Sequence, residues 1–230
     1  MPVILLVHAD GANGSTAFAD ASPGGHTLTA NNATVSTTSP KFGTGSANFS
    51  AGTNAAITVS GSGAEFNFGA AQFTVEAWAL FTTTPAGTQS IASKWGSAGN
   101  LGWTFRMASG ALAFIYSTTG SDSLSISAAF TPTLNTWYHL AADRDASNTL
   151  RVYVNGVVLA SGAVAVTIAP SSGACIIGNE PTNTRAFPGR LDEVRVTSGL
   201  AQYGGAFTPP TGPFNGVAAA TQGPRVMVLA

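Results

Sequence analysis

Residues 134–196 contain three segments that decide the fold: Leu134-Asn-Thr-Trp-Tyr-His-Leu140, Leu150-Arg-Val-Tyr-Val-Asn-Gly-Val-Val-Leu159 and Gly189-Arg-Leu-Asp-Glu-Val-Arg-Val196. Apolar and polar residues alternate in each segment, which predicts β-strands that bury one face. Asn155-Gly156 lies between two apolar runs and predicts a type I′ hairpin turn, in which both residues have positive φ. These segments together predict a β-sandwich.

Short strands of the same kind are expected along most of the chain, with clusters of Gly, Ser, Thr and Asn between them. The first is Val3–Val7. In Phe73-Thr-Val-Glu-Ala-Trp-Ala-Leu-Phe81 the alternation places Phe73 and Val75 on one face, and Glu76 and Trp78 on the other. Long helical periodicity is absent from the sequence. About a dozen strands with hairpin-sized spacings predict two packed antiparallel sheets.

The composition excludes several functional classes. Of the 230 residues, 44% are hydrophobic and only 8% are charged, against roughly 25% charged in an average soluble protein. The surface is therefore expected to consist of Ser, Thr, Asn, Gly and Ala, which suits a protein embedded in an assembly or facing the exterior. The net charge is −1, and the seven Arg and two Lys are scattered, so no nucleic-acid partner is expected.

The ends of the chain and its cysteine usage give further expectations. The N-terminus has no basic region and too short an apolar run for a signal peptide, and no stretch is long enough for membrane insertion. Cys175 is the one cysteine, so neither an internal disulfide nor a zinc cluster can form. Its apolar neighbours in Ala174-Cys-Ile-Ile177 predict an inert core thiol.

Seven motifs between residues 3 and 214 occur in an order that resembles the laminin G-like, concanavalin A-like jelly-roll family. They are Asp10-Gly-Ala-Asn-Gly-Ser15, Lys41-Phe-Gly-Thr-Gly-Ser-Ala-Asn-Phe49, Phe73-Thr-Val-Glu-Ala-Trp78, Trp137-Tyr-His-Leu-Ala141, Leu150-Arg-Val-Tyr-Val-Asn-Gly156, Ile177-Gly-Asn179 and Gly189-Arg-Leu-Asp-Glu-Val-Arg195. The resemblance implies an all-β fold, a two-sheet antiparallel jelly-roll sandwich. Family relatives bind glycans, proteins or lipids, often with calcium. We expect this domain at residues 1–212 and an extended C-terminal tail or arm at 213–230.

The segment Tyr203-Gly-Gly-Ala-Phe-Thr-Pro-Pro210 resembles the variety of this family that is common in bacteriophage virion proteins. That resemblance implies a non-enzymatic structural or adhesion protein on the virion surface, as a capsid decoration, fibre or tail module. A virion protein is made in the host cytoplasm, which fits the missing signal peptide. Its expected partners are other virion proteins of the capsid or tail and host surface polysaccharide, and we expect a homo-oligomer. The alternative is a calcium-dependent carbohydrate-binding, lectin-like module.

A glycoside hydrolase is a third hypothesis, because glucanases share this sandwich. They need two carboxylates flanking the scissile bond, and the sequence contains no Glu-x-Asp-x-x-Glu run. Glu76 is alone on its strand, and we expect it to pair with an arginine such as Arg195 or Arg151 rather than to act as an acid. Asp192 and Glu193 are expected to point to opposite faces. These patterns favour a protein without catalytic residues.

A calcium site is predicted where the first and last core strands meet. If Val3–Val7 pairs antiparallel with Leu191–Val196, Asp10 comes close to Asp192, and Asn13 and Asp20 add oxygen ligands of the kind calcium prefers. Asp192 is expected on the inward face with Val194 and Val196, where an unpaired carboxylate is costly. Calcium would relieve that cost, and so would hydrogen bonds from loop amides. The sequence leaves both explanations open.

Three aromatic residues are candidates for stacking on a sugar ring. Trp95 and Trp103 flank a glycine-rich segment at 96–102, and Tyr116 precedes the polar run 117–123. Packing in the interior is the alternative for each of them. Trp78 and Trp137 lie within predicted strands, so we expect them in or near the core.

The last residues, Pro224-Arg-Val-Met-Val-Leu-Ala230, form an apolar, strand-like end. Val226, Val228 and Leu229 are therefore candidate assembly contacts. The segment is expected either to add an edge strand to its own sandwich or to pair with a strand of a neighbouring subunit.

Overall fold

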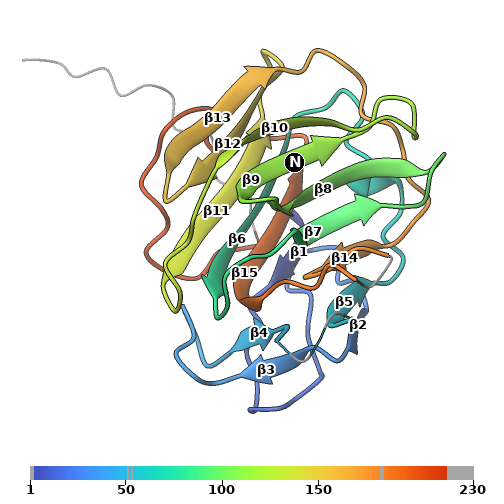
Figure 1. Ribbon diagram of the computed structural model, residues 1–230. Coiled ribbons are helices and arrows are strands. Elements are labelled where there is room, and N and C mark those ends of the chain that lie inside the picture. Colours follow the sequence, from blue (N-terminus) through green and yellow to red (C-terminus); the bar gives the residue numbers. More distant parts are fainter. Residues whose placement is uncertain (1–2, 51, 53, 182–183, 217–230) are drawn as a thin grey trace, which may run out of the picture.

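The computed structural model describes residues 3–50, 52, 54–181 and 184–216. Figure 1 shows two antiparallel β-sheets packed face to face, which confirms the predicted jelly-roll sandwich. No helix within the described ranges is long and apolar enough to cross a membrane. The predicted arm residues Val226, Val228 and Leu229 lie outside the described residues.

The first sheet contains the strands that the sequence patterns predicted most clearly. Its order is β13 (Val157–Ala163), β12 (Thr149–Val154), β11 (Trp137–Arg144), β6 (Phe73–Phe81), β15 (Gly189–Ser198), β4 (Ser46–Asn48) and β3 (Thr34–Ser36). β1 (Val3–Val7) pairs antiparallel with β15 beside this path, with Val7 opposite Val194. This pairing confirms the predicted contact between the first and last core strands.

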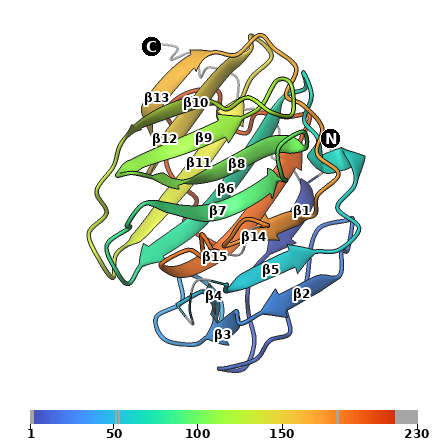
Figure 2. The same cartoon turned by 45° about the vertical axis from the view of Figure 1, so that its right-hand side comes forward.

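The second sheet faces the first across the core. Its order is β10 (Leu124–Ala129), β9 (Ala111–Tyr116), β8 (Leu101–Ala108), β7 (Thr88–Trp95), β14 (Cys175–Ile177), β5 (Ala56–Val59) and β2 (Leu28–Asn31). A single 3₁₀ turn, η1 (Ala64–Phe66), follows β5. Figure 2 shows β2 to β5 gathered at one end of the sandwich. These four short strands carry weak alternation, and the sequence patterns did not predict them.

The core consists of the inward faces of both sheets and includes a stack of aromatic rings. Phe73 of β6 stacks on Phe68 at 4.3 Å and on Phe114 of β9 at 4.9 Å between ring centroids. Trp103 of β8 stacks on Phe68 at 4.9 Å. Each such buried ring contributes roughly 1.5–3 kcal/mol through the hydrophobic effect, and ring stacking adds to this.

A β-bulge in β15 changes which face its acids occupy. Asp192 is opposite Trp78 and Arg195 is opposite Glu76, so two residues of β15, Glu193 and Val194, oppose the single residue between them on β6. Glu193 has a φ of 51°, which accommodates the extra residue. The prediction that Asp192 points inward with Val194 is therefore wrong. Asp192 shares the outer face with Trp78 and Arg195, because directly opposed residues lie on the same face of a sheet.

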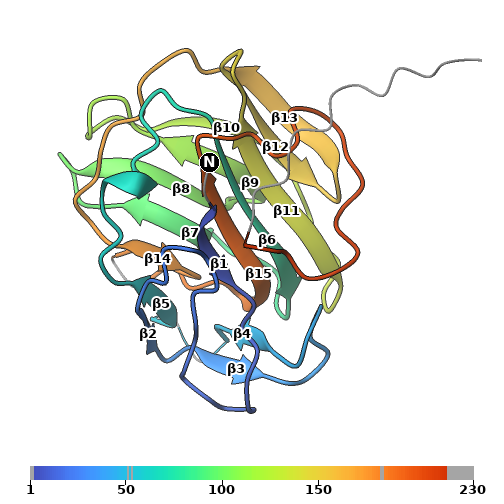
Figure 3. The same cartoon turned by 180° about the vertical axis from the view of Figure 1, so that it is seen from behind.

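Residues 199–216 form a strap across the outer face of the first sheet, as Figure 3 shows. The Phe207 amide donates to the carbonyl oxygen of Gly156 at 2.9 Å, and the Phe214 amide donates to the Glu193 carboxylate at 2.6 Å. Phe214 is buried against Val3 and Trp78. The packed region therefore continues at least to residue 214, past the predicted domain boundary at 212.

The predicted type I′ turn is confirmed, with φ of 50° at Asn155 and 79° at Gly156. The strap gives this turn a second requirement for glycine. A Cβ added at Gly156 would lie 1.9 Å from the carbonyl oxygen of Phe207, which no side chain rearrangement can relieve. Gly110 has a similar φ of 81°, and an added Cβ there has nothing within 4 Å.

We therefore predict different effects for alanine at these two turns. Gly110→Ala introduces only positive-φ strain, and we expect it to lower the free energy of unfolding by ~1 kcal/mol. Gly156→Ala also displaces the strap, and we expect it to lower the free energy of unfolding by ~3 kcal/mol. Urea unfolding followed by tryptophan fluorescence measures both losses. Equal losses in the two variants would show that the strap does not pack on the turn.

Candidate functional site

Glu76 lies at the centre of a buried polar cluster on the outer face of the first sheet. Its carboxylate accepts hydrogen bonds from Nε of Arg195 at 2.7 Å and from Tyr203 Oη of the strap, and it contacts Nε2 of His139 at 3.0 Å. The Glu76 side chain is completely buried. Burial alone would raise its pKa, but Arg195 and His139 lower it to about 2. The predicted pairing of Glu76 with an arginine is confirmed.

A second buried acid anchors the strap beside this cluster. Asp143 of β11 accepts hydrogen bonds from Tyr153 Oη at 2.9 Å and from the Gly204 amide at 2.8 Å. Tyr203 and Phe207 stack on each other and cover the His139 ring edge-on. The segment 203–210, which resembles the bacteriophage variety of the family, thus covers the buried acids Glu76 and Asp143, so a substrate does not reach them.

We predict that Glu76→Gln strongly destabilises the fold. The variant leaves the Arg195 guanidinium buried without a counter-ion, which typically costs ~3–5 kcal/mol. Glu65→Gln is the control, because the Glu65 side chain is 37% exposed, and a change there typically costs under ~1 kcal/mol. Urea unfolding at pH 7 measures both variants. A loss for Glu76→Gln no larger than for the control would contradict the assigned ion pair.

The residues of the predicted calcium site are bound by backbone amides instead. Asp10 accepts hydrogen bonds from the Thr44 amide, from Thr44 Oγ1 at 3.1 Å and from the Gly45 amide at 3.2 Å. Asp192 Oδ2 accepts from the amides of Lys41 and Phe42 at 2.9 and 3.1 Å. Both acids therefore hold the loop 41–45, which is the second explanation that the sequence left open.

The other two predicted ligands are held elsewhere. Asn13 Oδ1 accepts from the Thr37 amide at 3.3 Å, and Asp20 accepts from the Leu6 amide at 2.9 Å. Within the described residues, no group of three or more His, Cys, Asp or Glu is arranged to hold a metal ion. This arrangement does not fit the predicted calcium ion, because the carboxylates are dispersed among amide donors rather than converging on one point.

Asp192 has an unusual electrostatic setting. Its Oδ1 is buried and has no hydrogen-bond partner among the described residues. Burial raises the pKa of Asp192 to about 7, and the nearby Glu193 contributes to the rise. The folded protein therefore keeps a proton on this group between about pH 4 and pH 7, where the unfolded chain has released it. This group makes the free energy of unfolding fall as the pH rises through that window.

We predict that Asp192→Asn removes the fall in the free energy of unfolding that Asp192 causes as the pH rises. The free energy of unfolding of the variant, relative to that of the parent protein, is expected to rise by on the order of 2 kcal/mol from pH 4 to pH 8. Asp145→Asn should behave oppositely and lose stability at neutral pH, because hydrogen bonds from Thr149 and Arg151 outweigh burial and lower the pKa of Asp145. Urea unfolding at several pH values tests both variants, and an unchanged pH profile for Asp192→Asn would refute the raised pKa.

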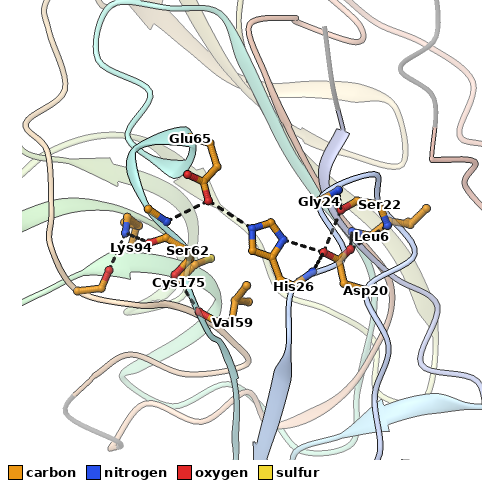
Figure 4. Close-up of polar contacts among 12 residues, drawn as sticks. Leu6, Asp20, Ser22, Gly24, His26, Val59, Ser62, Glu65, Lys94 and Cys175 are labelled. Atoms are coloured by element: carbon orange, nitrogen blue, oxygen red, sulfur yellow. Dashed lines mark hydrogen bonds and ion pairs between the residues drawn. The ribbon is translucent and has the colours of Figure 1, made fainter.

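Figure 4 shows a network that the sequence patterns did not reveal, centred on His26. Nδ1 of His26 lies 2.8 Å from Asp20 Oδ2, and its Nε2 lies 3.3 Å from Glu65 Oε1. The ring therefore links the loop after β1 to η1. Burial would raise the pKa of Asp20, but amide hydrogen bonds and His26 lower it. Asp20 and His26 come from the loop after β1 and Glu65 comes from η1, so no single local motif contains all three residues.

The same figure shows why this network holds no activated nucleophile. Ser62 Oγ donates to the Val59 carbonyl oxygen at 2.9 Å and accepts from the Cys175 amide at 2.7 Å, so it is committed to backbone groups. Lys94 Nζ donates to the carbonyl oxygens of Ser62 and Gly173. Burial raises the pKa of the Cys175 thiol to about 12, which agrees with the predicted inert core thiol.

Two of the three predicted sugar-stacking residues are in the core. Trp103 is fully buried, and its indole Nε1 donates to the Phe66 carbonyl oxygen at 2.8 Å. Tyr116 is 7% exposed and packs in the same core. The alternation of β8 and β9 directs both rings inward, so neither face of Trp103 is open to a sugar. Trp95, at the end of β7, keeps partial exposure. The three residues therefore do not form one exposed platform.

An open cleft of about 590 Å³ lies where loops from both sheets meet. It is bounded by the segment after β4, the β6–β7 loop and the segment that precedes β15. Its lining residues in the described part of the chain are Phe49, Ser50, Gly52, Thr82, Thr83, Ala86, Thr88, Gln89, Thr184, Arg185, Ala186, Phe187 and Pro188. None of these was predicted as a site residue, because hydroxyl-bearing loop residues are common throughout this chain.

The described lining residues of the cleft carry both polar and apolar side chains. Hydroxyl groups, the Gln89 amide and the Arg185 guanidinium supply hydrogen-bond donors and acceptors, whereas Ala86 and Pro188 supply small apolar surfaces. Among the described lining residues there is no Asp, Glu, His or Cys. The described lining residues therefore combine hydrogen-bonding groups with small apolar surfaces, as small-molecule sites commonly do.

The fold and the cleft define a lectin-like all-β binding sandwich. Residues 50–201 match the sequence model of the Concanavalin A-like lectin/glucanases superfamily. The match spans more than half of the chain, and the chain belongs to this superfamily. A search of curated proteins finds no match.

Solved structures with the same fold include three toxin binding domains. The binding domain of Paraclostridial Mosquitocidal Protein 1 has a TM-score of 0.60 and 16% identity, covering 87% of this chain and 50% of that chain. The botulinum neurotoxin serotype D binding domain has a TM-score of 0.65 and 13% identity, covering 87% and 49%.

The binding domain of Botulinum Neurotoxin DC in complex with SialylT has a TM-score of 0.62 and 14% identity, covering 87% of this chain and 49% of that chain. The identities are low, so these likenesses show a shared fold. The chain spans about half the length of each of the three structures.

Proposed function

We propose that this protein is a non-enzymatic binding module of a bacteriophage virion, which docks on neighbouring virion proteins and adheres to host surface glycans. The observation that carries the binding function is the open cleft, which is lined by hydroxyl, amide and guanidinium groups. Two toxin structures of the same fold are binding domains, which supports this function. Many copies on one particle would strengthen a weak contact through avidity.

Two features support the virion setting. The segment 203–210, which resembles the bacteriophage variety of this family, forms part of the strap that covers the first sheet. The chain also has only 8% charged residues, a composition suited to a protein held within an assembly. We propose a place on the capsid or tail surface and a homo-oligomeric state, as is common for symmetric assemblies.

The absence of catalysis belongs to the same proposal. Glycoside hydrolysis needs two carboxylates beside the bound sugar. In the described residues, the acids Glu76, Asp143 and Asp192 are buried on the outer face of the first sheet, and no carboxylate lines the cleft. A glycan in the cleft would therefore be bound and released unchanged.

A calcium-dependent lectin is the competing function, and one binding experiment separates the two. The biotinylated protein, displayed on streptavidin, is applied to an array of bacterial and mammalian glycans in calcium or in EDTA. We expect binding that is equal in both buffers, because Asp10 and Asp192 are held by amides. Binding that EDTA abolishes would favour the lectin, and chromatographic detection of a shortened glycan would revive the hydrolase.

The virion setting needs its own test. Particles of the phage that encodes this chain are purified and their proteins are quantified by mass spectrometry. We expect this protein in many copies per particle. Its absence from purified particles would refute the virion setting and leave the binding function to be judged from the array.

A further inference from the structure

We infer that the cleft selects glycans that carry carboxylate groups, and that Arg185 is the residue that binds the carboxylate. This inference rests on the proposed glycan-binding function. It follows from the charge around Glu180, from the way the backbone holds Arg185, and from the hydroxyl groups that share the cleft with it.

The buried acid Glu180 serves two arginines at once. Its Oε1 accepts hydrogen bonds from Arg106 Nη1 at 2.8 Å and from Thr104 Oγ1 at 3.1 Å, and its Oε2 accepts from Arg185 Nη1 at 2.8 Å. The Glu180 side chain is only 2% exposed. One carboxylate therefore faces two guanidinium groups, which leaves one positive charge uncompensated at this place.

That surplus charge is presented at the cleft. The Arg106 side chain is 12% exposed, whereas the Arg185 side chain is 36% exposed and lines the cleft. Nη1 is the one side-chain nitrogen of Arg185 with a hydrogen bond to the described residues. The rest of its planar fork is available to a second carboxylate, a geometry that guanidinium groups recognise in a bidentate manner.

The backbone of Arg185 is fixed in advance of binding. Its amide donates to Asn179 Oδ1 at 3.0 Å, and its carbonyl oxygen accepts from the Ser90 amide of β7 at 2.8 Å. Two residues further on, the Phe187 amide donates to the Gly178 carbonyl oxygen at 2.7 Å. A ligand therefore does not have to order this segment, which lowers the entropic cost of binding.

The remaining lining groups favour a sugar over a simple anion. Thr82, Thr83 and Thr88 line the cleft with hydroxyl-bearing side chains. Gln89 also lines it, with its Nε2 donating to the Ala86 carbonyl oxygen. These groups match the hydroxyls of a pyranose, and Ala86 gives its apolar face a small contact. The volume of about 590 Å³ falls within the range of roughly 300–1,000 Å³ typical of small-molecule sites.

The test compares the parent protein with Arg185→Gln on a glycan array that contains carboxylate-bearing, sulfated, phosphorylated and neutral glycans. We expect binding to carboxylate-bearing glycans alone, and a loss of at least ~10-fold in affinity for Arg185→Gln by biolayer interferometry. The fold should tolerate this change, because Glu180 and Arg106 then form a balanced pair. Arg151→Gln is the matched control, since Arg151 of β12 pairs with Asp145 and does not line the cleft.

Thr83→Val is a second variant that leaves the Glu180 pairs intact, and we expect it to weaken binding without changing the thermal midpoint. Methyl esterification of the glycan's carboxylate should reduce its affinity for the parent protein by a similar factor to Arg185→Gln. Binding to neutral, sulfated or phosphorylated glycans, or binding that Arg185→Gln leaves unchanged, would overturn this inference and keep the proposed function. Binding to no glycan at all would overturn the proposed glycan-binding function itself.

Discussion

Glu76 carries its negative charge in the middle of a β-sheet, where burial without a partner would cost several kcal/mol. Three elements far apart in the sequence remove that cost: β15 supplies Arg195, β11 supplies His139, and the strap supplies Tyr203. The charge therefore ties the centre of the first sheet to a segment that looks like a free arm in the sequence. The outer face of the sheet is closed because this charge has to be enclosed.

The bulge in β15 makes that enclosure possible. The extra residue brings Arg195 opposite Glu76 while Val194 stays in the core. It also turns Glu193 toward the Phe214 amide and places Asp192 against the loop 41–45. One irregular position thus connects the first strand, an early loop and the end of the described chain, which explains why the acids of this region are structural.

In the function that we propose, binding falls to the loops at one end of the sandwich. Among the described residues, the buried acids Glu76, Asp143 and Glu180 are paired with arginines. The cleft is lined by hydroxyl groups, apolar side chains and one guanidinium. Such a division suits a module that recognises its ligand without chemistry. The surplus positive charge beside Glu180 is then the one strong electrostatic feature that the cleft can offer a ligand.

The jelly-roll resemblance implied the pairing of the first and last strands. The sequence by itself determined the sandwich, the Asn155-Gly156 turn and an arginine partner for Glu76. These depend on period-two alternation, on positive φ and on the cost of a lone buried charge, all of which are local properties. Only the tertiary structure decided the inward packing of Trp103, the outward turn of Asp192 and the position of Arg185 in a cleft. Each of those depends on which distant segment arrives opposite a residue, and a single bulge or loop contact changes that without leaving a local pattern.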